Sequence, residues 1–252
     1  MNPSPVVPDL WSELRRHTPA RIALGRAGTS LPTAEVLRFA AAHAQARDAV
    51  HEPLDTQALK AWLQDEGWRV LQVQSRAAHR DEYLRRPDRG RRLREQDAEA
   101  LRQGSQGPCD LAIVVADGLS AAAVQRHALP TLRALQRALD GELSVAPLVL
   151  ATQARVALAD EAGELLQART VMILLGERPG LSSPDSLGAY LTYEPRVGRV
   201  DAERNCVSNI RPEGLPPAAA AARIAWLLRE SLRRRLSGVA LKDDSETPLL
   251  GG

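Results

Sequence analysis

Lysine is almost absent from this sequence. Lys60 and Lys242 are the only lysines among 33 basic residues, so arginine carries nearly all of the positive charge. Arginine favours fixed, two-pronged contacts with carboxylates and phosphates, although genome composition explains such a bias at least as well. With 31 acidic residues, the net charge is only +2. This near-neutral charge balance does not indicate the clustered basic surface that is typical of nucleic-acid-binding proteins.

Cysteine and long apolar runs are also scarce. Cys109 and Cys206 lie far apart and form no C-x-x-C motif, which fits two reduced thiols better than a disulfide framework. No stretch approaches the roughly 20 apolar residues of a transmembrane helix. The N-terminus lacks the apolar core of a signal peptide. We therefore expect a soluble, cytoplasmic protein.

Several well-known motifs of catalysis and nucleotide binding are missing. The sequence contains no G-x-G, and therefore no G-x-G-x-x-G, and no G-x-x-x-x-G-K-[ST]. These absences weaken the dinucleotide and P-loop interpretations. There is no G-x-S-x-G nucleophile motif, and the five histidines show no metal-ligand spacing. No self-sufficient catalytic set is present, so the sequence predicts one half of a shared site.

The first hundred residues contain mainly helical patterns. Apolar residues at helical spacing predict helices at 33–50 and 54–67, and a highly charged stretch predicts another at 91–102. Residues 68–75, "WRVLQVQS", predict a strand. We expect residues 1–107 to form an N-terminal helical arm and subdomain.

From Cys109 onward, strand and helix patterns alternate, and several strands are apolar enough to be buried on both faces. The predicted strands span 110–117, 145–152, 170–176, 187–193 and 205–210. The predicted helices span 121–139, 160–168 and 216–238. This alternation predicts an α/β fold with a Rossmann-like, open, mostly parallel sheet over residues 108–240. A flexible tail is expected at 241–252.

Loops after three of these strands carry polar residues. In open α/β sheets, ligands bind outside the carboxyl ends of the strands, which selects the loops "ADGLS", "ATQARV" and "GERPG". Asp117 and Ser120 of the first loop are weaker candidates, because Ser120 suits a helix cap equally well. In the third loop, Gly176 and Gly180 are expected to let the backbone approach a bulky ligand. Arg178 is expected to pair with Glu177 or to reach a phosphate.

Five stretches of the sequence, taken together, resemble one protein family. They are "LLGERPGLSSPDSLGAYLTYEP", "DGLS", "DAERNCVSNIRPEGLPP", "ELRRHTPARIALGRAGTSLPTAEVLRFAAAHAQARDAV" and "YLRRPDRGRRL". In this combination the chain resembles the small (light) subunit of ethanolamine ammonia-lyase from about Leu10 to Val239. The resemblance implies an adenosylcobalamin-dependent ammonia-lyase that converts ethanolamine to acetaldehyde and ammonia by a radical mechanism. It also implies activity only with a large subunit, in a hetero-oligomer of large–small pairs, and a Rossmann-like core that covers the cobalamin at their interface.

The resemblance further implies three cobalamin contacts: Val156 in "QARVAL", Glu177 in "GERPG" and Cys206 in "RNCVSN". Glu177 can accept hydrogen bonds from amide or ribose donors. Val156 can pack on an apolar edge, and Cys206 is small and polarizable enough for close approach. Without the family, the same residues fit core packing, a solvated acid and a buried structural thiol. No catalytic or metal-binding residue is expected in this chain.

Two further patterns bear on the cofactor and on location. No histidine has an aspartate two positions earlier, so D-x-H-x-x-G is absent and the lower base of cobalamin is expected to stay on cobalt. Some relatives carry an N-terminal extension that directs them to bacterial microcompartments. About ten residues precede the resemblance here, which favours free cytosol. Two alternatives stay open: a stand-alone α/β transferase with a nucleotide-like cofactor, such as a methyltransferase, and an assembly subunit without a ligand.

Overall fold

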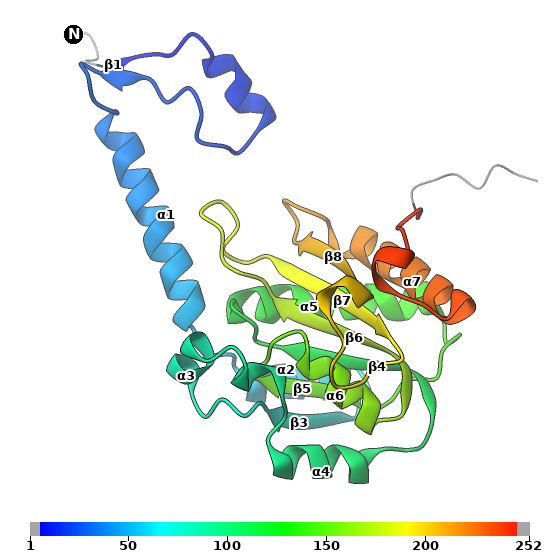
Figure 1. Ribbon diagram of the computed structural model, residues 1–252. Helices are drawn as coiled ribbons and strands as arrows, with labels where there is room; N and C mark the ends of the chain where they lie inside the picture. The colour runs from blue at the N-terminus through cyan, green and yellow to red at the C-terminus, as the bar shows by residue number, and fades with distance from the viewer. Residues whose placement is uncertain (1–5, 246–252) are drawn as a thin grey trace, which may run out of the picture.

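A six-stranded sheet forms the centre of the protein, as a computed structural model of the chain describes it for residues 6–245 (Figure 1). Its strand order is β3 (Val70–Gln74), β5 (Leu148–Thr152), β4 (Cys109–Ala116), β6 (Ala168–Gly176), β7 (Leu187–Tyr193) and β8 (Arg204–Ile210). The three pairings from β3 to β6 are parallel, and the two from β6 to β8 are antiparallel. The predicted α/β fold with a mostly parallel sheet is confirmed, and the sheet is mixed.

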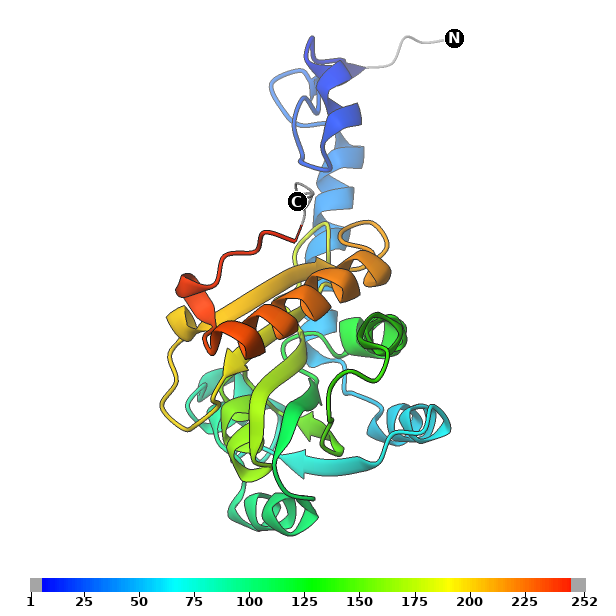
Figure 2. The same cartoon turned by 90° about the vertical axis from the view of Figure 1, so that its right-hand side faces the viewer.

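Helices cover both faces of this sheet (Figure 2). One layer contains α2 (Thr56–Asp65), α5 (Ala121–Leu139) and α7 (Pro217–Arg234), and the other contains α4 (Glu95–Gly104) and α6 (Leu158–Leu165). Side chains alternate along a strand, so Ile113 of β4 packs in the first layer and Val114 in the second. Tyr190 of β7 belongs to the face of the second layer.

Some predicted boundaries are shifted for local reasons. The strand predicted at 145–152 begins at Leu148, because Pro147 has no N–H to donate to the ladder. The helix predicted at 160–168 spans Leu158–Leu165. Gln167 has a positive φ of 56°, which a continuing right-handed helix does not accommodate.

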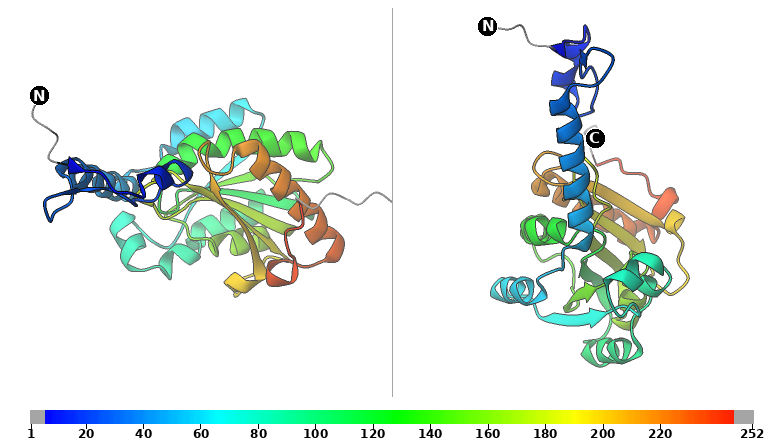
Figure 3. Two further views of the ribbon diagram at one scale, coloured as in Figure 1. Left: turned by 90° about the horizontal axis from the view of Figure 1, so that it is seen from above. Right: turned by 90° about the vertical axis from the view of Figure 1, so that its left-hand side faces the viewer.

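The N-terminal segment projects from the rest of the chain. Helix α1 (Thr33–His51) stands away from the sheet, with the short strands β1 (Val6–Val7) and β2 (Arg26–Ala27) and the 3-10 helix η1 (Ser12–His17) at its outer end (Figures 1 and 3). Only Ala42 and Ala49 of α1 are buried. The rest of the helix is largely exposed to solvent.

The early part of the chain also contributes to the central sheet. Strand β3 and helices α2 and α4 precede residue 108, yet they pack with the elements that follow it. The division into residues 1–107 and 108–240 stays a prediction. The predicted tail at 241–252 falls mostly outside the described residues. Within residues 6–245, no helix has both the length and the apolar character needed to cross a membrane.

Candidate ligand pocket at the carboxyl ends of the strands

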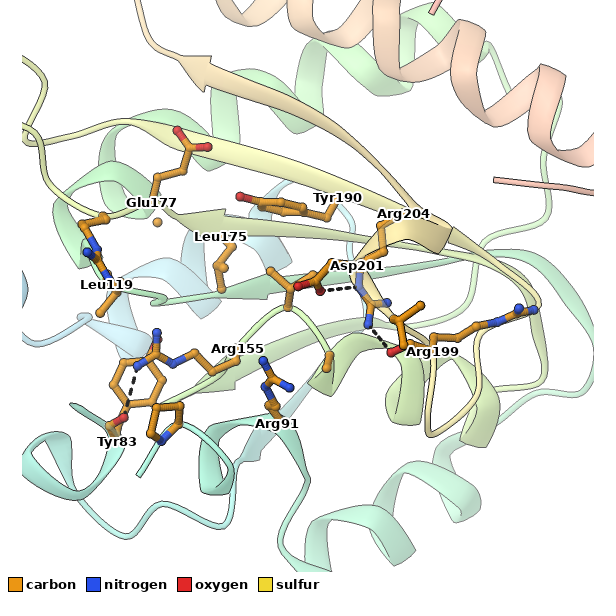
Figure 4. A pocket seen from close by; sticks show the side chains of 16 residues that line it. Tyr83, Arg91, Leu119, Arg155, Leu175, Glu177, Tyr190, Arg199, Asp201 and Arg204 are labelled. Atoms are coloured by element: carbon orange, nitrogen blue, oxygen red, sulfur yellow. Dashed lines mark hydrogen bonds and ion pairs between the residues drawn. The ribbon is translucent and has the colours of Figure 1, made fainter. Parts of the chain in front are cut away.

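A pocket of about 630 Å³ opens where β5 and β6 end (Figure 4). Its volume lies within the range of small-molecule sites, roughly 300–1,000 Å³. Leu119 lines it from the loop "ADGLS", residues 155–156 from "ATQARV" and residues 176–178 from "GERPG", and Ala157 follows the second of these loops. The three loops that the sequence selects as ligand-binding candidates therefore line one pocket.

Glu177 lies at the upper edge of this pocket, directly after β6. The Ser186 hydroxyl donates to Glu177 Oε2, and the Asn209 N–H donates to the same oxygen at 3.2 Å. A Cβ on Gly188 would lie 2.8 Å from Glu177 Oε1, so this glycine leaves room for the carboxylate on the sheet surface. Oε1 has no hydrogen bond within residues 6–245 and is free to accept one from a ligand. The expected ion pair between Glu177 and Arg178 is not formed; Arg178 is exposed.

Tyr190 and Cys206 continue the polar surface beside Glu177. They are opposite each other in the β7–β8 pairing, so their side chains lie on the same face of the sheet. Burial, together with the nearby Cys206 and Glu177, raises the pKa of Tyr190. Cys206 is exposed at the surface, where desolvation by the neighbouring protein raises the pKa of its thiol. The thiol therefore remains protonated at neutral pH, and the interpretation of Cys206 as a buried structural residue is wrong.

Val156 lines the same pocket as Glu177 and lies two residues before the start of α6. It is partly buried against the second helical layer and exposes one side to the pocket. Asp117 holds the loop that leads to it, because its carboxylate accepts from the Gln153 N–H at 2.9 Å and the Ala154 N–H at 3.1 Å. Burial raises the pKa of Asp117. Asp117 does not line the pocket and acts as a support for the loop.

Ser120 and Gly176 also have structural roles. The Ser120 hydroxyl accepts from the Ala123 N–H at 3.3 Å and donates to the Pro184 carbonyl at 2.9 Å. The Ser120 side chain therefore caps α5, which is the role that the sequence offered as the alternative to a ligand contact. A Cβ on Gly176 would lie 2.0 Å from the Ser120 carbonyl oxygen. The chain itself therefore requires a glycine at this position, while the approach of Gly176, which lines the pocket, to a ligand stays a prediction.

Tyr83, on α3 (Arg80–Arg85), forms part of the wall opposite Glu177 and was not selected by sequence reasoning. It is fully buried, and its hydroxyl donates to the Ala154 carbonyl at 3.1 Å. The guanidinium carbons of Arg155 and Arg80 lie 4.3 and 4.8 Å from the centre of its ring. One feature of the sequence could have drawn attention to Tyr83. It is an aromatic residue inside the charged run "RDEYLRRPDRGRRL", in a sequence with only three tyrosines.

Positive charge dominates the lining of the pocket. The five arginines are Arg91, Arg155, Arg178, Arg199 and Arg204, and the two acids are Glu177 and Asp201. Arg199 and Arg204 each pair with a carboxylate, whereas Arg91, Arg155 and Arg178 pair with none within residues 6–245. In the same part of the chain, no group of three or more histidine, cysteine, aspartate or glutamate residues is placed to hold a metal ion. The side chains that line the pocket can therefore supply hydrogen bonds and positive charge to a ligand.

Known proteins resemble this chain over nearly its whole length. The family described as "Ethanolamine ammonia-lyase light chain (EutC)" matches residues 8–242. The ethanolamine ammonia-lyase small subunit of Azotobacter vinelandii is 60% identical over 253 residues, which cover 99% of this chain and 94% of the relative. The small subunit of Xanthomonas campestris pv. campestris is 59% identical over 247 residues (96% and 91%), and that of Ralstonia nicotianae is 56% identical over 252 residues (98% and 93%). The chain belongs to the ethanolamine ammonia-lyase light chain family.

Proposed function

We propose that this chain is the small subunit of an ethanolamine ammonia-lyase and covers one side of adenosylcobalamin at the interface with the large subunit. The enzyme is a carbon–nitrogen lyase that converts ethanolamine to acetaldehyde and ammonia. Family membership over residues 8–242 is the observation that carries this proposal. The large subunit is the necessary partner.

The chemistry of the pocket fits a corrinoid ligand. Cobalamin presents amide arms, a ribose, a phosphate and an apolar base. Glu177 Oε1 offers an acceptor to amide or ribose donors, and Val156 and Leu175 offer apolar surface in the same pocket. We propose that Val156, Glu177 and Cys206 contact the cofactor. The exposed thiol of Cys206 extends the contact surface along β8, beyond the rim of the pocket.

The work is divided between the two subunits. When bound, adenosylcobalamin supplies the radical chemistry through its cobalt–carbon bond. The residues of this chain bind and orient the cofactor from one side, and together with the partner they keep water away from the reaction. The substrate pocket and the catalytic residues are assigned to the large subunit.

We assign further roles to the two predicted regions of the chain. The core at 108–240 acts as a Rossmann-like domain whose strand-end pocket faces the cofactor. Residues 1–107 contribute a subdomain and an N-terminal arm that docks on the large subunit. The complex works in the cytoplasm, and enclosure in a bacterial microcompartment is the less favoured location. The alternative of a stand-alone transferase is set aside, because the chain belongs to the ethanolamine ammonia-lyase light chain family and lacks the glycine motifs.

Co-expression with the large subunit tests the proposal. The purified pair should carry a corrinoid absorption spectrum after incubation with adenosylcobalamin and should deaminate ethanolamine. This chain alone, given the same cofactor, should show no turnover, because its sequence contains no recognisable self-sufficient catalytic motif. A complex that binds no corrinoid, or turnover by the isolated chain, would refute the proposed function.

A further inference from the structure

Arg155 is held in a fixed orientation at the pocket wall. Its guanidinium carbon lies 4.3 Å from the centre of the Tyr83 ring, and its Nη2 donates to the Tyr83 carbonyl at 3.3 Å. Its backbone N–H donates to the Gly90 carbonyl at 2.8 Å. A Cβ on Gly90 would come within 2.9 Å of Arg155 Cγ, so the glycine is what allows this packing. A guanidinium stacked in this way loses little further freedom when it binds a ligand.

The charge of Arg155 has no counter-ion among the residues that the structure describes. The side chain is partly buried, yet no carboxylate within residues 6–245 pairs with it, and its Nε makes no hydrogen bond. Arg80, which also stacks on Tyr83, differs in lying 3.4 Å from the Asp117 carboxylate. A partly buried cation without a partner is costly. An anion bound in the pocket would remove that cost.

The surroundings of Arg155 add to the positive potential. Arg91 lines the same wall, opposite Glu177 and Tyr190, and has no carboxylate partner within the described range (Figure 4). Helix α6 begins directly after Ala157, so the positive end of its dipole lies at the pocket as well. The pocket therefore has an acceptor wall at Glu177 and a cationic wall at Arg155.

We infer that Arg155, held by Tyr83 and assisted by Arg91, forms a subsite for the phosphodiester of the cobalamin nucleotide. This inference rests on the proposed cobalamin function. The amide arms of a corrinoid are neutral, so the phosphodiester is its one anionic group. A guanidinium matches the two free oxygens of a phosphodiester with paired N–H donors. Arg155 thereby selects complete cobalamins over corrinoids that lack the nucleotide.

The test compares two ligands on the reconstituted large–small complex. Adenosylcobalamin contains the phosphodiester, whereas adenosylcobinamide keeps the corrin ring and amide arms but lacks the phosphodiester, ribose and base. Arg155→Gln should weaken adenosylcobalamin binding by roughly 10- to 150-fold, as expected for the loss of a charged hydrogen bond. The affinity for adenosylcobinamide should stay unchanged. Spectroscopic titration gives both dissociation constants.

Three further variants make the outcome specific. Arg155→Lys should restore part of the cobalamin affinity, because it retains the charge. Arg137→Gln removes an exposed arginine of α5 in the opposite helical layer and should change neither constant. An unchanged cobalamin affinity in Arg155→Gln, or an equal loss for both ligands, would overturn the phosphodiester subsite. If the proposed function itself is wrong, Glu177→Gln and Arg155→Gln should both leave the affinities for adenosylcobalamin and adenosylcobinamide unchanged. If only the phosphodiester subsite is wrong, Glu177→Gln should still weaken binding.

Discussion

Arg204 Nη1 donates to both carboxylate oxygens of Asp160, at 2.7 and 2.8 Å, where the two side chains are only 3% and 2% exposed. The same nitrogen lies 3.2 Å from the Thr192 hydroxyl oxygen. Asp160 belongs to α6, which begins at the pocket, and Arg204 begins β8, which carries Cys206. This ion pair therefore ties β8, which carries the proposed cofactor contact Cys206, to the helix that begins two residues after Val156.

Removing Arg204 should destabilise the fold strongly. Arg204→Ala leaves the Asp160 carboxylate buried without a partner, which should lower the free energy of unfolding by about 3–5 kcal/mol. Arg229→Ala is the matched control, because its ion pair with Glu142 is 42% and 49% exposed and should contribute less than about 1 kcal/mol. Urea unfolding of the two variants measures the difference. Similar losses in both would contradict a special role for the buried pair.

Asp160 should also make stability depend on pH. Burial outweighs Arg204 and raises the pKa of Asp160 from 3.8 to about 6. The folded chain then keeps this proton to higher pH than the unfolded chain does, so the free energy of unfolding falls as pH rises from about 4 to about 6. The expected loss is at most about 3 kcal/mol. Urea unfolding at several pH values should show that the wild type loses stability relative to Asp160→Asn over this range, since the other carboxylates titrate in both proteins. A wild type that gains stability over Asp160→Asn in this range would reverse the assignment.

Local patterns predicted most of the fold. The run "LGAYLTY" predicts a strand, and β7 spans Leu187–Tyr193. The meeting of three loops at one pocket was also predictable, because parallel strands present their carboxyl ends at the same edge of a sheet. Glu177 and Val156 were selected through the family resemblance, since neither stands out chemically in its own segment.

The remaining part of the site depends on contacts between distant residues. Tyr190 meets Cys206 only because β7 and β8 pair antiparallel in one register, with an irregularity between Leu187 and Ala189. Tyr83 and Arg155 are far apart in sequence, and their stacking depends on how α3 packs against the loop after β5. Sequence periodicity carries no information on such side-chain pairs, so the cationic wall could not be predicted.

The substitution Glu177→Gln should weaken cobalamin binding because it replaces the acceptor oxygen Oε1. Ser186 and the Asn209 N–H both donate to Oε2, so they should keep the amide oxygen of glutamine at that position. The amide NH₂ would then replace Oε1 and face a donor of the ligand. We expect a loss of roughly 5- to 150-fold in the affinity of the reconstituted complex for adenosylcobalamin, with ethanolamine binding almost unchanged.

Glu99→Gln provides the control for this substitution, because Glu99 is an exposed acid of α4 that does not line the pocket. Titration of both variant complexes with adenosylcobalamin measures the effect. An unaltered cobalamin affinity in Glu177→Gln, or a loss restricted to ethanolamine, would show that the loop after β6 serves another purpose.

The N-terminal segment should be needed for assembly and dispensable for folding of the core. Leu10 and Trp11, near its outer end, are 97% and 67% exposed, and exposed apolar side chains of this size are typical of protein–protein contacts. Deleting residues 1–50 removes few buried side chains from the rest of the chain. We therefore expect the core to keep a cooperative unfolding transition, while co-purification with the large subunit is abolished.

A point variant separates docking from the general effects of a large deletion. Trp11→Ser should reduce co-purification with the large subunit, because aromatic anchors contribute most to the affinity of an interface. Val239→Ser removes an apolar side chain that is also exposed, at the other end of the chain, and should have no effect. Pull-down of the tagged large subunit, followed by quantification of the bound chain, measures all three variants. Full recovery of the deletion variant with the large subunit would place the interface on the sheet domain and its pocket alone, because those are the parts that the deletion leaves in place.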